Sequence, residues 1–449
     1  MAELVDLAQS IAGRAPGGEQ VEAYVTHERD FYAKAFEGEV EATSAAEPRG
    51  AAVRLISEGR VGFAYTTDLT DSGLASVVER ARENSASATP DDAAGMAPAW
   101  DEVPADVPGL VDEEHLRADP AAKAAFTVAL EQATRSVDPR IRTEEAIYSD
   151  AVSEVAIATS AGVAGAYRRT DAWCYSVAIA EDGDDTQVAF EFDLARGLGA
   201  LDHEAIAERA AQRALSTLGA KKIPSAKMPV VFDPYTSGQF LGVIATALTG
   251  EAVQRGRSLF AGKIGEQVAA PALSLIDDGR VAGAPGSAPW DAEGVPTRRT
   301  PVIEAGTLKS FLYDVTSARR DGRSSTGNAA RSGFKTAPHA TASNLAFDST
   351  GETRDEILRS AGRALLVQDF HGVHSGTNSI SGDFSVGVTG RLIEDGELTQ
   401  AVREVTIAAP MLDILSRVTA VGTDLRWLPF GGSYGGATTL VSEMTVAGA

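Results

Sequence analysis

Cysteine is nearly absent from this sequence. Its 449 residues include one, Cys174, so no disulfide can form within the chain. Cys174 lies among aromatic and apolar residues in a strand-like run, which predicts a buried and unreactive thiol. No apolar run approaches the roughly 20 residues needed to cross a bilayer, and the first residues do not resemble a secretion signal. These absences predict a cytoplasmic protein that does not enter a membrane.

Positive charge is scarce as well. Lys and Arg total 40 against 63 Asp and Glu, which gives a formal net charge of -23 and a sequence pI of about 4.7. A surface that neutralises phosphates needs many Lys and Arg side chains, so nucleic acid is not an expected partner. Hydrophobic residues make up 44% of the chain, which is enough to build packed cores.

The usual signatures of nucleotide and catalytic sites are also missing. The sequence has no G-x-x-x-x-G-K-[ST], no G-x-G-x-x-G between a strand and a helix, and no H-E-x-x-H. Residues 431–435 match G-x-S-x-G around Ser433, but a strand-like run follows them and the last histidine, His374, precedes them. We therefore expect a glycine-rich loop rather than a serine nucleophile.

Histidines offer little for a metal site. Of the six in the chain, only His371 and His374 are close in sequence. A tetrahedral site needs three or four converging ligands, so these two would need carboxylates from elsewhere in the chain. The favoured interpretation is a pair of loop residues near a binding surface, or residues with a structural role.

The pattern of apolar residues predicts an α+β fold in two parts. We expect an N-terminal mixed α/β domain over 1–225 and a C-terminal domain dominated by antiparallel β-sheet over 226–449. A Lys- and Pro-rich segment at 220–234 marks the boundary. The Pro-, Asp- and Ala-rich segment 85–108 predicts a poorly ordered connector.

Individual elements follow from periodicity and turn residues. A turn at 58–60 predicts a hairpin, and Ala305-Gly306 and Asp395-Gly396 predict two more. Period-3.6 patterns predict helices, and Asp202 is the expected N-cap of one of them. The predicted helices cover a short N-terminal stretch with Leu4, Leu7 and Ile11 on one face, 71–85, 121–137, 203–218, 235–255, 353–365 and 410–418.

Several blocks of the sequence resemble a known family. They are D-x-E-G and S-T-G-N within Trp290–Arg331, S-G-D-F-S-x-G within Ser379–Ala408, and the run Gly59–Thr70. Together they resemble the TldD/TldE (PmbA) family, historically described as gyrase modulators, over nearly the whole chain. The resemblance implies a cytoplasmic protein with an N-terminal α/β domain and a mainly antiparallel C-terminal domain.

The same resemblance implies a heterodimeric peptidase. In this family the TldD-type subunit is a zinc metallopeptidase, with H-E-x-x-x-H on a helix and a further Cys ligand from a glycine-rich loop near the C-terminus. The TldE-type subunit lacks the motif. The pair degrades unfolded or flexible peptides and trims leader peptides.

This sequence has lost the expected zinc ligands. The run GEAVQR stands in the place of H-E-x-x-x-H, so Gly250 and Arg255 replace the histidines and Glu251 keeps the acid. The loop 428–436 (LPFGGSYGG) contains no Cys. Glycine has no donor atom and protonated Arg repels Zn²⁺. The resemblance thus implies no metal in this chain, and Glu251 and Arg255 are expected to pair at i,i+4 on one helix face.

The main functional prediction is a metal-free, non-catalytic TldE-like subunit. It would bind a TldD-like catalytic subunit that carries the zinc, together with extended or unfolded peptides. His371, His374 and Asp383 lie in a segment that resembles a loop near the family's active cleft, so they are candidates for peptide or partner contact. Two alternatives stay open: an independent hydrolase that uses His371, His374, Asp383 or Ser433, and a non-enzymatic binding protein.

Overall fold

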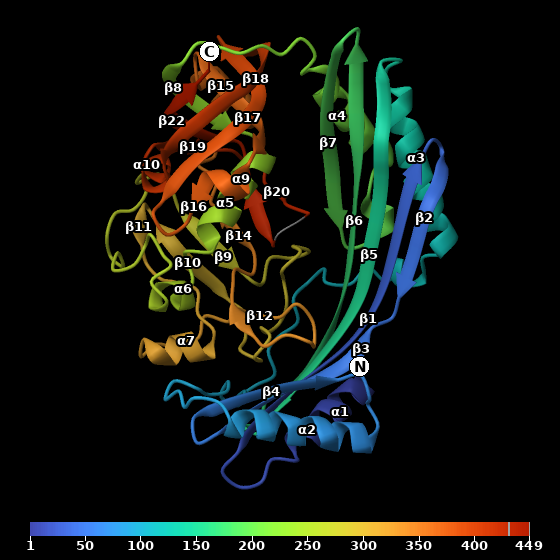
Figure 1. Ribbon diagram of the computed structural model, residues 1–449, viewed down its shortest axis with the longest axis vertical. Coiled ribbons are helices and arrows are strands. Elements are labelled where there is room, and N and C mark those ends of the chain that lie inside the picture. Colours follow the sequence, from blue (N-terminus) through green and yellow to red (C-terminus); the bar gives the residue numbers. More distant parts are fainter. Residues whose placement is uncertain (430–431, 449) are drawn as a thin grey trace.

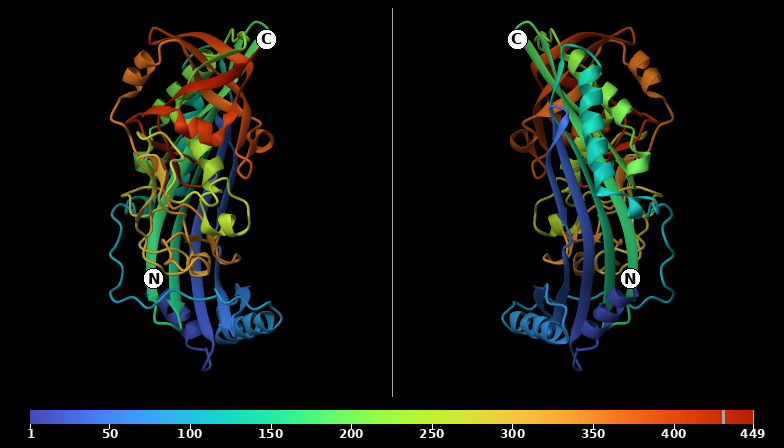
Figure 2. Two further views of the ribbon diagram at one scale, coloured as in Figure 1. Left: turned by 90° about the vertical axis from the view of Figure 1, so that its left-hand side faces the viewer. Right: turned by 90° about the vertical axis from the view of Figure 1, so that its right-hand side faces the viewer.

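The computed structural model of the chain describes residues 1–429 and 432–448 and shows an elongated molecule (Figure 1). A long β-sheet forms one side of it, and a more compact C-terminal part packs against one face of that sheet. Side views show that the long strands extend through most of the height of the molecule (Figure 2). None of the helices in the described ranges is long and apolar enough to cross a membrane.

The long sheet contains seven antiparallel strands. They are β1 (Gln20–Phe36), β2 (Glu39–Ala46), β3 (Arg49–Ser57), β4 (Arg60–Thr66), β5 (Ile141–Thr159), β6 (Ala164–Asp182) and β7 (Asp185–Ala195). Their order is β4-β3-β1-β5-β6-β7, and β2 pairs with the second half of β1. β5 and β6 have 19 residues each, far more than the usual five or so, and the sheet extends alongside the C-terminal part and beyond its lower end (Figure 1).

Four helices cover one face of this sheet, and side-chain alternation explains which face. They are α1 (Ala2–Ala12), α2 (Asp71–Ala86), α3 (Pro120–Ser136) and α4 (His203–Leu215). Because successive side chains of a strand point to opposite faces, Val21 and Val25 of β1 pack in the cluster with α1 and α2. The neighbouring Glu22 and Tyr24 face the C-terminal part, where they meet Arg331.

The C-terminal part is built from two larger sheets and one small one. Its strands are β8 (Ala226–Phe232), β9 (Leu275–Asp278), β10 (Arg299–Glu304), β11 (Thr307–Leu308), β12 (Ala329–Ala330), β13 (His339–Ala340), β14 (Leu345–Phe347), β15 (Ala364–His371), β16 (Thr377–Asn378), β17 (Asp383–Glu394), β18 (Glu397–Pro410), β19 (Val418–Val421), β20 (Arg426–Trp427), β21 (Tyr434–Gly436) and β22 (Thr439–Ala447). The orders are β15-β8-β22-β18-β17-β16, with β19 beside β22, and β11-β10-β9-β14-β21-β20. Among these pairs β14–β21 and β15–β8 are parallel, and the rest are antiparallel.

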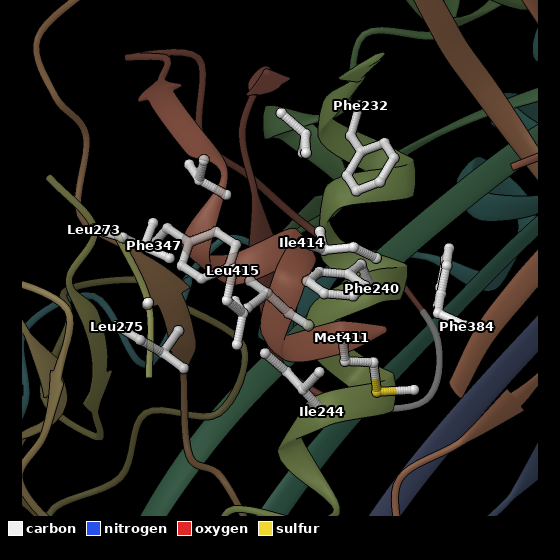
Figure 3. Close-up of a cluster of buried hydrophobic side chains, with 14 of the residues drawn as sticks. Phe232, Phe240, Ile244, Leu273, Leu275, Phe347, Phe384, Met411, Ile414 and Leu415 are labelled. Atoms are coloured by element: carbon white, nitrogen blue, oxygen red, sulfur yellow. The ribbon is translucent and has the colours of Figure 1, made fainter. Parts of the chain in front are cut away.

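Within the described residues six helices complete this part, and α5 lies at the centre of its core. The helices are α5 (Pro234–Ala245), α6 (Gly250–Gln254), α7 (Val315–Arg320), α8 (Arg354–Ser360), α9 (Val373–Gly376) and α10 (Met411–Ser416). Phe240 and Ile244 of α5 meet side chains from both larger sheets and from α10, including Phe232, Leu275 and Met411 (Figure 3). Burial of such a large apolar cluster holds α5 rigidly and thereby fixes the segment that follows it.

The start of α5 is also tied to the long sheet's helices. Asp233 caps α5 by accepting from the backbone N–H of Thr236 at 2.9 Å. The same carboxylate pairs with Arg213 of α4 at 2.9 Å, and Arg213 lies 3.5 Å from Asp369 of β15. Burial raises the pKa of Asp369 to about 6. This ion cluster positions α5 relative to the long sheet.

Most of the expectations about local structure are confirmed. The fold is α+β, as the apolar pattern predicts, and Asp202 accepts two backbone N–H groups at the start of α4. The expected turns at Glu58-Gly59 and Asp395-Gly396 have positive φ at both residues, the geometry that suits two-residue hairpins. The division of the chain at residue 225 stays a prediction.

Four expectations about segments of the chain are wrong. The helix expected over 235–255 is two helices, because the chain turns between α5 and α6. The helices expected over 353–365 and 410–418 are the shorter α8 and α10. Segment 85–108 is not a loose connector: after α2 ends it has little regular structure, but Ala97 is buried and Trp100 donates to the Gly294 carbonyl at 2.7 Å.

Cys174 is expected to be unreactive in the folded protein. Its side chain is fully buried on β6, and burial raises the pKa of the thiol to about 12. Since the thiolate is the reacting form, modification by a disulfide reagent such as DTNB should be at least about tenfold slower in buffer than in denaturant. Equal rates under both conditions would contradict this prediction.

Candidate functional site

The segment predicted to stand in the place of the family's zinc motif, residues 250–255, begins with a separate short helix, α6. The chain leaves α5 at Ala245, and Thr249 caps α6 by accepting from the backbone N–H of Ala252 at 3.2 Å. Gly250 then donates its backbone N–H to the Leu312 carbonyl at 2.9 Å. This contact with the segment before α7 holds the start of α6 in place, which a single continuous helix would not allow.

Gly250 leaves no room for any side chain. A Cβ built on this residue would lie 2.2 Å from Cε1 and 2.3 Å from Cδ1 of Tyr313. The Tyr313 ring is itself fixed, because it is 1% exposed and its hydroxyl donates to Asp321 at 3.0 Å. The position therefore lacks a donor atom, and the ring fills the space that a histidine would need.

Glu251 and Arg255 pair with each other, as their i,i+4 spacing predicts. Arg255 Nη2 lies 2.7 Å from Glu251 Oε1, and the Arg255 side chain is 62% exposed. The pair is worth little to stability because both charges remain near solvent. It does give the retained acid a partner that is not a metal-bound water.

The residues present do not fit the zinc site of the TldD type. The chain supplies a glycine and an arginine at the positions predicted to correspond to that site's histidines, and the single cysteine lies on β6, in the long sheet. Loop 428–436 contains no Cys, and its Phe430 and Gly431 lie outside the described residues. Among the residues that the structure describes, no group of three His, Cys, Asp or Glu is placed to hold a metal ion.

The three predicted contact residues do not form one cluster. His371 ends β15, and its Nε2 lies 2.8 Å from the Thr389 hydroxyl of β17; burial lowers the pKa of this imidazole. Asp383 opens β17 and accepts from the Ser381 hydroxyl at 2.5 Å. His374 lies on α9, is exposed and lines a cavity.

That cavity lies along α5 and has a volume of about 520 Å³. Gln239 and Val243 of α5 form one wall, and His374 and Thr377 form another. Leu428, Pro429 and Tyr434 close it on the side of the glycine-rich loop. Neither Glu251 nor Arg255 lines it, so the predicted motif positions and this cavity are distinct places in the C-terminal part.

Ser433 is not arranged as a nucleophile. The residue is buried, and its hydroxyl donates to the side-chain oxygen of Asn344 at 2.6 Å. A serine nucleophile needs a hydrogen bond to a base such as histidine, and His371 bonds Thr389 instead. Of the match's described residues, Gly432 and Ser433 form a loop, as expected, and Tyr434 and Gly435 already belong to β21.

Comparison with known proteins covers most of the chain. Family models match in three consecutive pieces: PmbA/TldA metallopeptidase domain 1 at residues 21–85, the central domain at 113–218 and the C-terminal domain at 225–448. The chain belongs to the PmbA/TldD metallopeptidase family. The resemblance seen in the sequence is thereby confirmed, while the family membership by itself assigns no activity to this chain.

Individual members of the PmbA/TldD family are similar to this chain over most or all of its length. The metalloprotease PmbA of Escherichia coli O157:H7 is 27% identical over 413 residues, which cover 92% of this chain and 88% of that protein. A crystal structure from Thermotoga maritima, 26% identical, superposes with a TM-score of 0.89 over 99% of this chain and 100% of that one. The structure of TldE from Thermococcus kodakarensis, 23% identical, has the same fold, with a TM-score of 0.88 over 100% of both chains.

The D-x-E-G block turns out to belong to a buried ion cluster. Asp291 accepts from the backbone N–H groups of Glu293, Val295 and Ala329, at distances of 2.9 to 3.0 Å. Glu293 lies 2.8 Å from Arg54 of β3 and accepts from the backbone N–H of Val315 at 2.7 Å. Burial raises the pKa of both carboxyl groups.

This cluster crosses between the two parts of the molecule. Arg54 lies 2.6 Å from Glu22 of β1, and Arg331 donates to the same Glu22. Arg331 also stacks its guanidinium 4.8 Å from the centre of the Tyr24 ring. The sequence block marked Glu293 and Arg331 as part of a family pattern, but nothing in their spacing pointed to partners on β1 and β3.

Proposed function

We propose that this chain is the metal-free, TldE-like subunit of a heterodimeric zinc peptidase, acting in the cytoplasm on extended or unfolded peptides. The zinc is in a TldD-like partner, and this chain carries no catalytic residue. The observation that carries the proposal is the closure of position 250 by the Tyr313 ring, because a first zinc ligand has neither an atom nor a space there.

The pairing of Glu251 with Arg255 gives further support. In a zinc peptidase the motif's Glu acts on a metal-bound water, whereas here the acid faces an arginine 2.7 Å away. Three ligand positions have changed together, and each change removes a donor. The remaining role is to bind partner and peptide, for which His371, His374 and Asp383 stay candidates. His374 is the favoured one, because it lines the cavity beside α5.

Co-expression with a TldD-like chain that has an intact H-E-x-x-x-H tests this proposal. We expect the two chains to elute together, to hold stoichiometric zinc and to cleave an unstructured fluorogenic peptide. The isolated chain should hold no stoichiometric zinc and cleave nothing. A matched control replaces the Glu of the partner's motif by Gln, which should preserve the complex and abolish cleavage.

Two results would contradict the proposal. One is stoichiometric zinc together with proteolysis in a preparation of this chain alone. The other is failure of the two chains to associate when both are folded by circular dichroism. A pull-down that recovers other proteins but no peptidase subunit would instead favour a non-enzymatic binding protein.

A further inference from the structure

A second cavity lies between the long sheet and the C-terminal part, away from α6. Its volume is about 680 Å³. One wall is formed by the face of β1, β5 and β6 that the helices do not cover, and the other by segments 285–297, 328–333 and 341–343. Leu428, Pro429 and Tyr434 line both this cavity and the one beside α5, so the two adjoin at the glycine-rich loop.

Two residues that line this cavity each have a buried polar atom that lacks a hydrogen bond. The indole N–H of Trp290 and the side-chain oxygen of Asn328 have no partner among the described residues, although these residues are 3% and 2% exposed. The Asn328 orientation is fixed by its amide nitrogen, which donates to Asp277 at 2.7 Å and to the Thr341 carbonyl at 3.1 Å. Buried groups of this kind normally find a partner, so a ligand or a water belongs there.

The two atoms offer one donor and one acceptor. A peptide group presents the complementary pair, a carbonyl oxygen that accepts and an N–H that donates. The aromatic walls formed by Tyr24, Tyr167 and Trp290 suit the flat faces of backbone amides and the carbon chains of side chains. The chemistry of the walls therefore favours a peptide over an anion or a nucleotide.

The side chains that line the cavity carry an excess of negative charge. The cationic side chains already have carboxylate partners: Arg169 lies 3.1 Å from Asp171, His27 lies 2.7 Å from Glu47, and Arg331 pairs with Glu22. Glu28, on the β1 wall, accepts from the Ser153 hydroxyl at 3.3 Å and has no ion pair in the described ranges.

A neighbouring carboxyl adds to this excess. Asp30 follows Glu28 on the same face of β1. Burial, together with the charge of Glu28, raises the pKa of Asp30 to about 6. A cationic group placed near Glu28 would stabilise the charged forms of both carboxyl groups. The nearby tyrosine and tryptophan rings would attract the same cation.

We propose that this cavity binds an extended peptide segment that carries a positive charge. Backbone amides of the segment hydrogen-bond to the Trp290 N–H and the Asn328 oxygen, and a lysine or arginine side chain, or a free amino terminus, pairs with Glu28. The inference rests on the proposed function in that the bound segment belongs to the peptide that the partner subunit cleaves. It assigns this chain a preference for basic peptides.

The test measures peptide binding by the full chain. Two N-acetylated, C-amidated hexapeptides are compared that differ only in one lysine against norleucine, both with a fluorescent label. We expect the lysine peptide to bind about tenfold more tightly, the effect of one added charge-assisted hydrogen bond. The preference should weaken as salt is raised, because the half-buried Glu28 is accessible to screening ions.

Three variants assign the contacts. Glu28→Gln keeps the size of the side chain. It should abolish the preference for lysine without weakening the binding of the norleucine peptide. Trp290→Phe removes the indole N–H and should weaken the binding of both peptides about fivefold to tenfold. Glu83→Gln, an exposed position on α2, is the matched control and should bind like the unaltered chain. Thermal unfolding of each variant checks that it is folded.

Each outcome separates this inference from the proposed function. Equal binding of the two peptides, or Glu28→Gln behaving like Glu83→Gln, overturns the basic-peptide site even if the co-expressed pair cleaves peptides. Unchanged binding of both peptides in Trp290→Phe means that water, not peptide, satisfies the indole, and this overturns the backbone contact. A lysine preference that depends on Glu28 supports the site even if no catalytic partner associates. The failure to associate would contradict only the proposed heterodimer.

Discussion

Gly250→His is expected to destabilise the protein by about 1 to 3 kcal/mol and to gain no zinc. The substitution restores the histidine that the proposed alignment places first in the family's metal motif, but the structure leaves no space for that side chain. Its Cβ alone would come within 2.2 Å of the Tyr313 ring, and that ring is buried and held through Asp321. Either the ring or the start of α6 must move, and the contact of Gly250 with the Leu312 carbonyl resists the second movement.

A mutant cycle separates this clash from other effects of the new side chain. Gly250→Ala should already cause most of the loss in free energy of unfolding that is expected for Gly250→His. Adding Tyr313→Ala to the Gly250→Ala chain should reduce that loss, because it removes the obstructing ring. Gly17→Ala is the control, since a Cβ there meets nothing within 4 Å and its backbone is not left-handed. Urea unfolding followed by circular dichroism gives the free energies, and elemental analysis gives the zinc content.

The opposite result has a clear meaning. If Gly250→His is as stable as the unaltered chain and binds stoichiometric zinc, Tyr313 must yield readily, and position 250 is then a recoverable ligand site. In that case the absence of zinc chemistry would depend on Arg255 and on loop 428–436 alone. The proposed function would lose the observation that carries it.

The sequence was informative where neighbouring residues decide the structure. The Glu58-Gly59 turn follows from a local rule, and it is present in the structure. The pairing of Glu251 with Arg255 also follows from helix geometry, since residues four apart share a face. None of these features requires knowledge of what lies across the molecule.

The sequence did not predict structural features that depend on contacts with distant segments of the chain. The apolar positions from Phe240 to Val253 keep a period of 3.6 across the turn between α5 and α6, so periodicity cannot reveal the break. The break depends on Leu312, a residue of another segment whose carbonyl accepts a hydrogen bond from the Gly250 N–H. In the same way, the partners Glu22 and Arg331 are 309 residues apart, and no spacing rule connects them.

That long-range cluster should respond strongly to the loss of one charge. Glu22→Gln is expected to destabilise the protein by about 3 to 5 kcal/mol, the usual cost of removing one partner from a buried ion pair. Glu22 is fully buried and pairs with both Arg54 and Arg331, so its neutralisation leaves two buried guanidinium groups with Glu293 as the nearby acid. Burial already lowers the pKa of Arg331, which shows how poorly that site solvates a charge.

The comparison with an exposed pair makes this prediction specific to burial. Glu443→Gln removes the acid of two surface contacts, with Lys227 and with Arg417. The side chains are 45%, 69% and 36% exposed in that order, and the cost should stay below about 1 kcal/mol. Since Glu22 lies on the long sheet and Arg331 in the C-terminal part, Glu22→Gln should also loosen the contact between them. Urea unfolding followed by tryptophan fluorescence and by circular dichroism should then give two separate transitions in place of coincident ones. A single transition and a loss no larger than that of Glu443→Gln would mean that the apolar contacts, not the ion cluster, join the two parts.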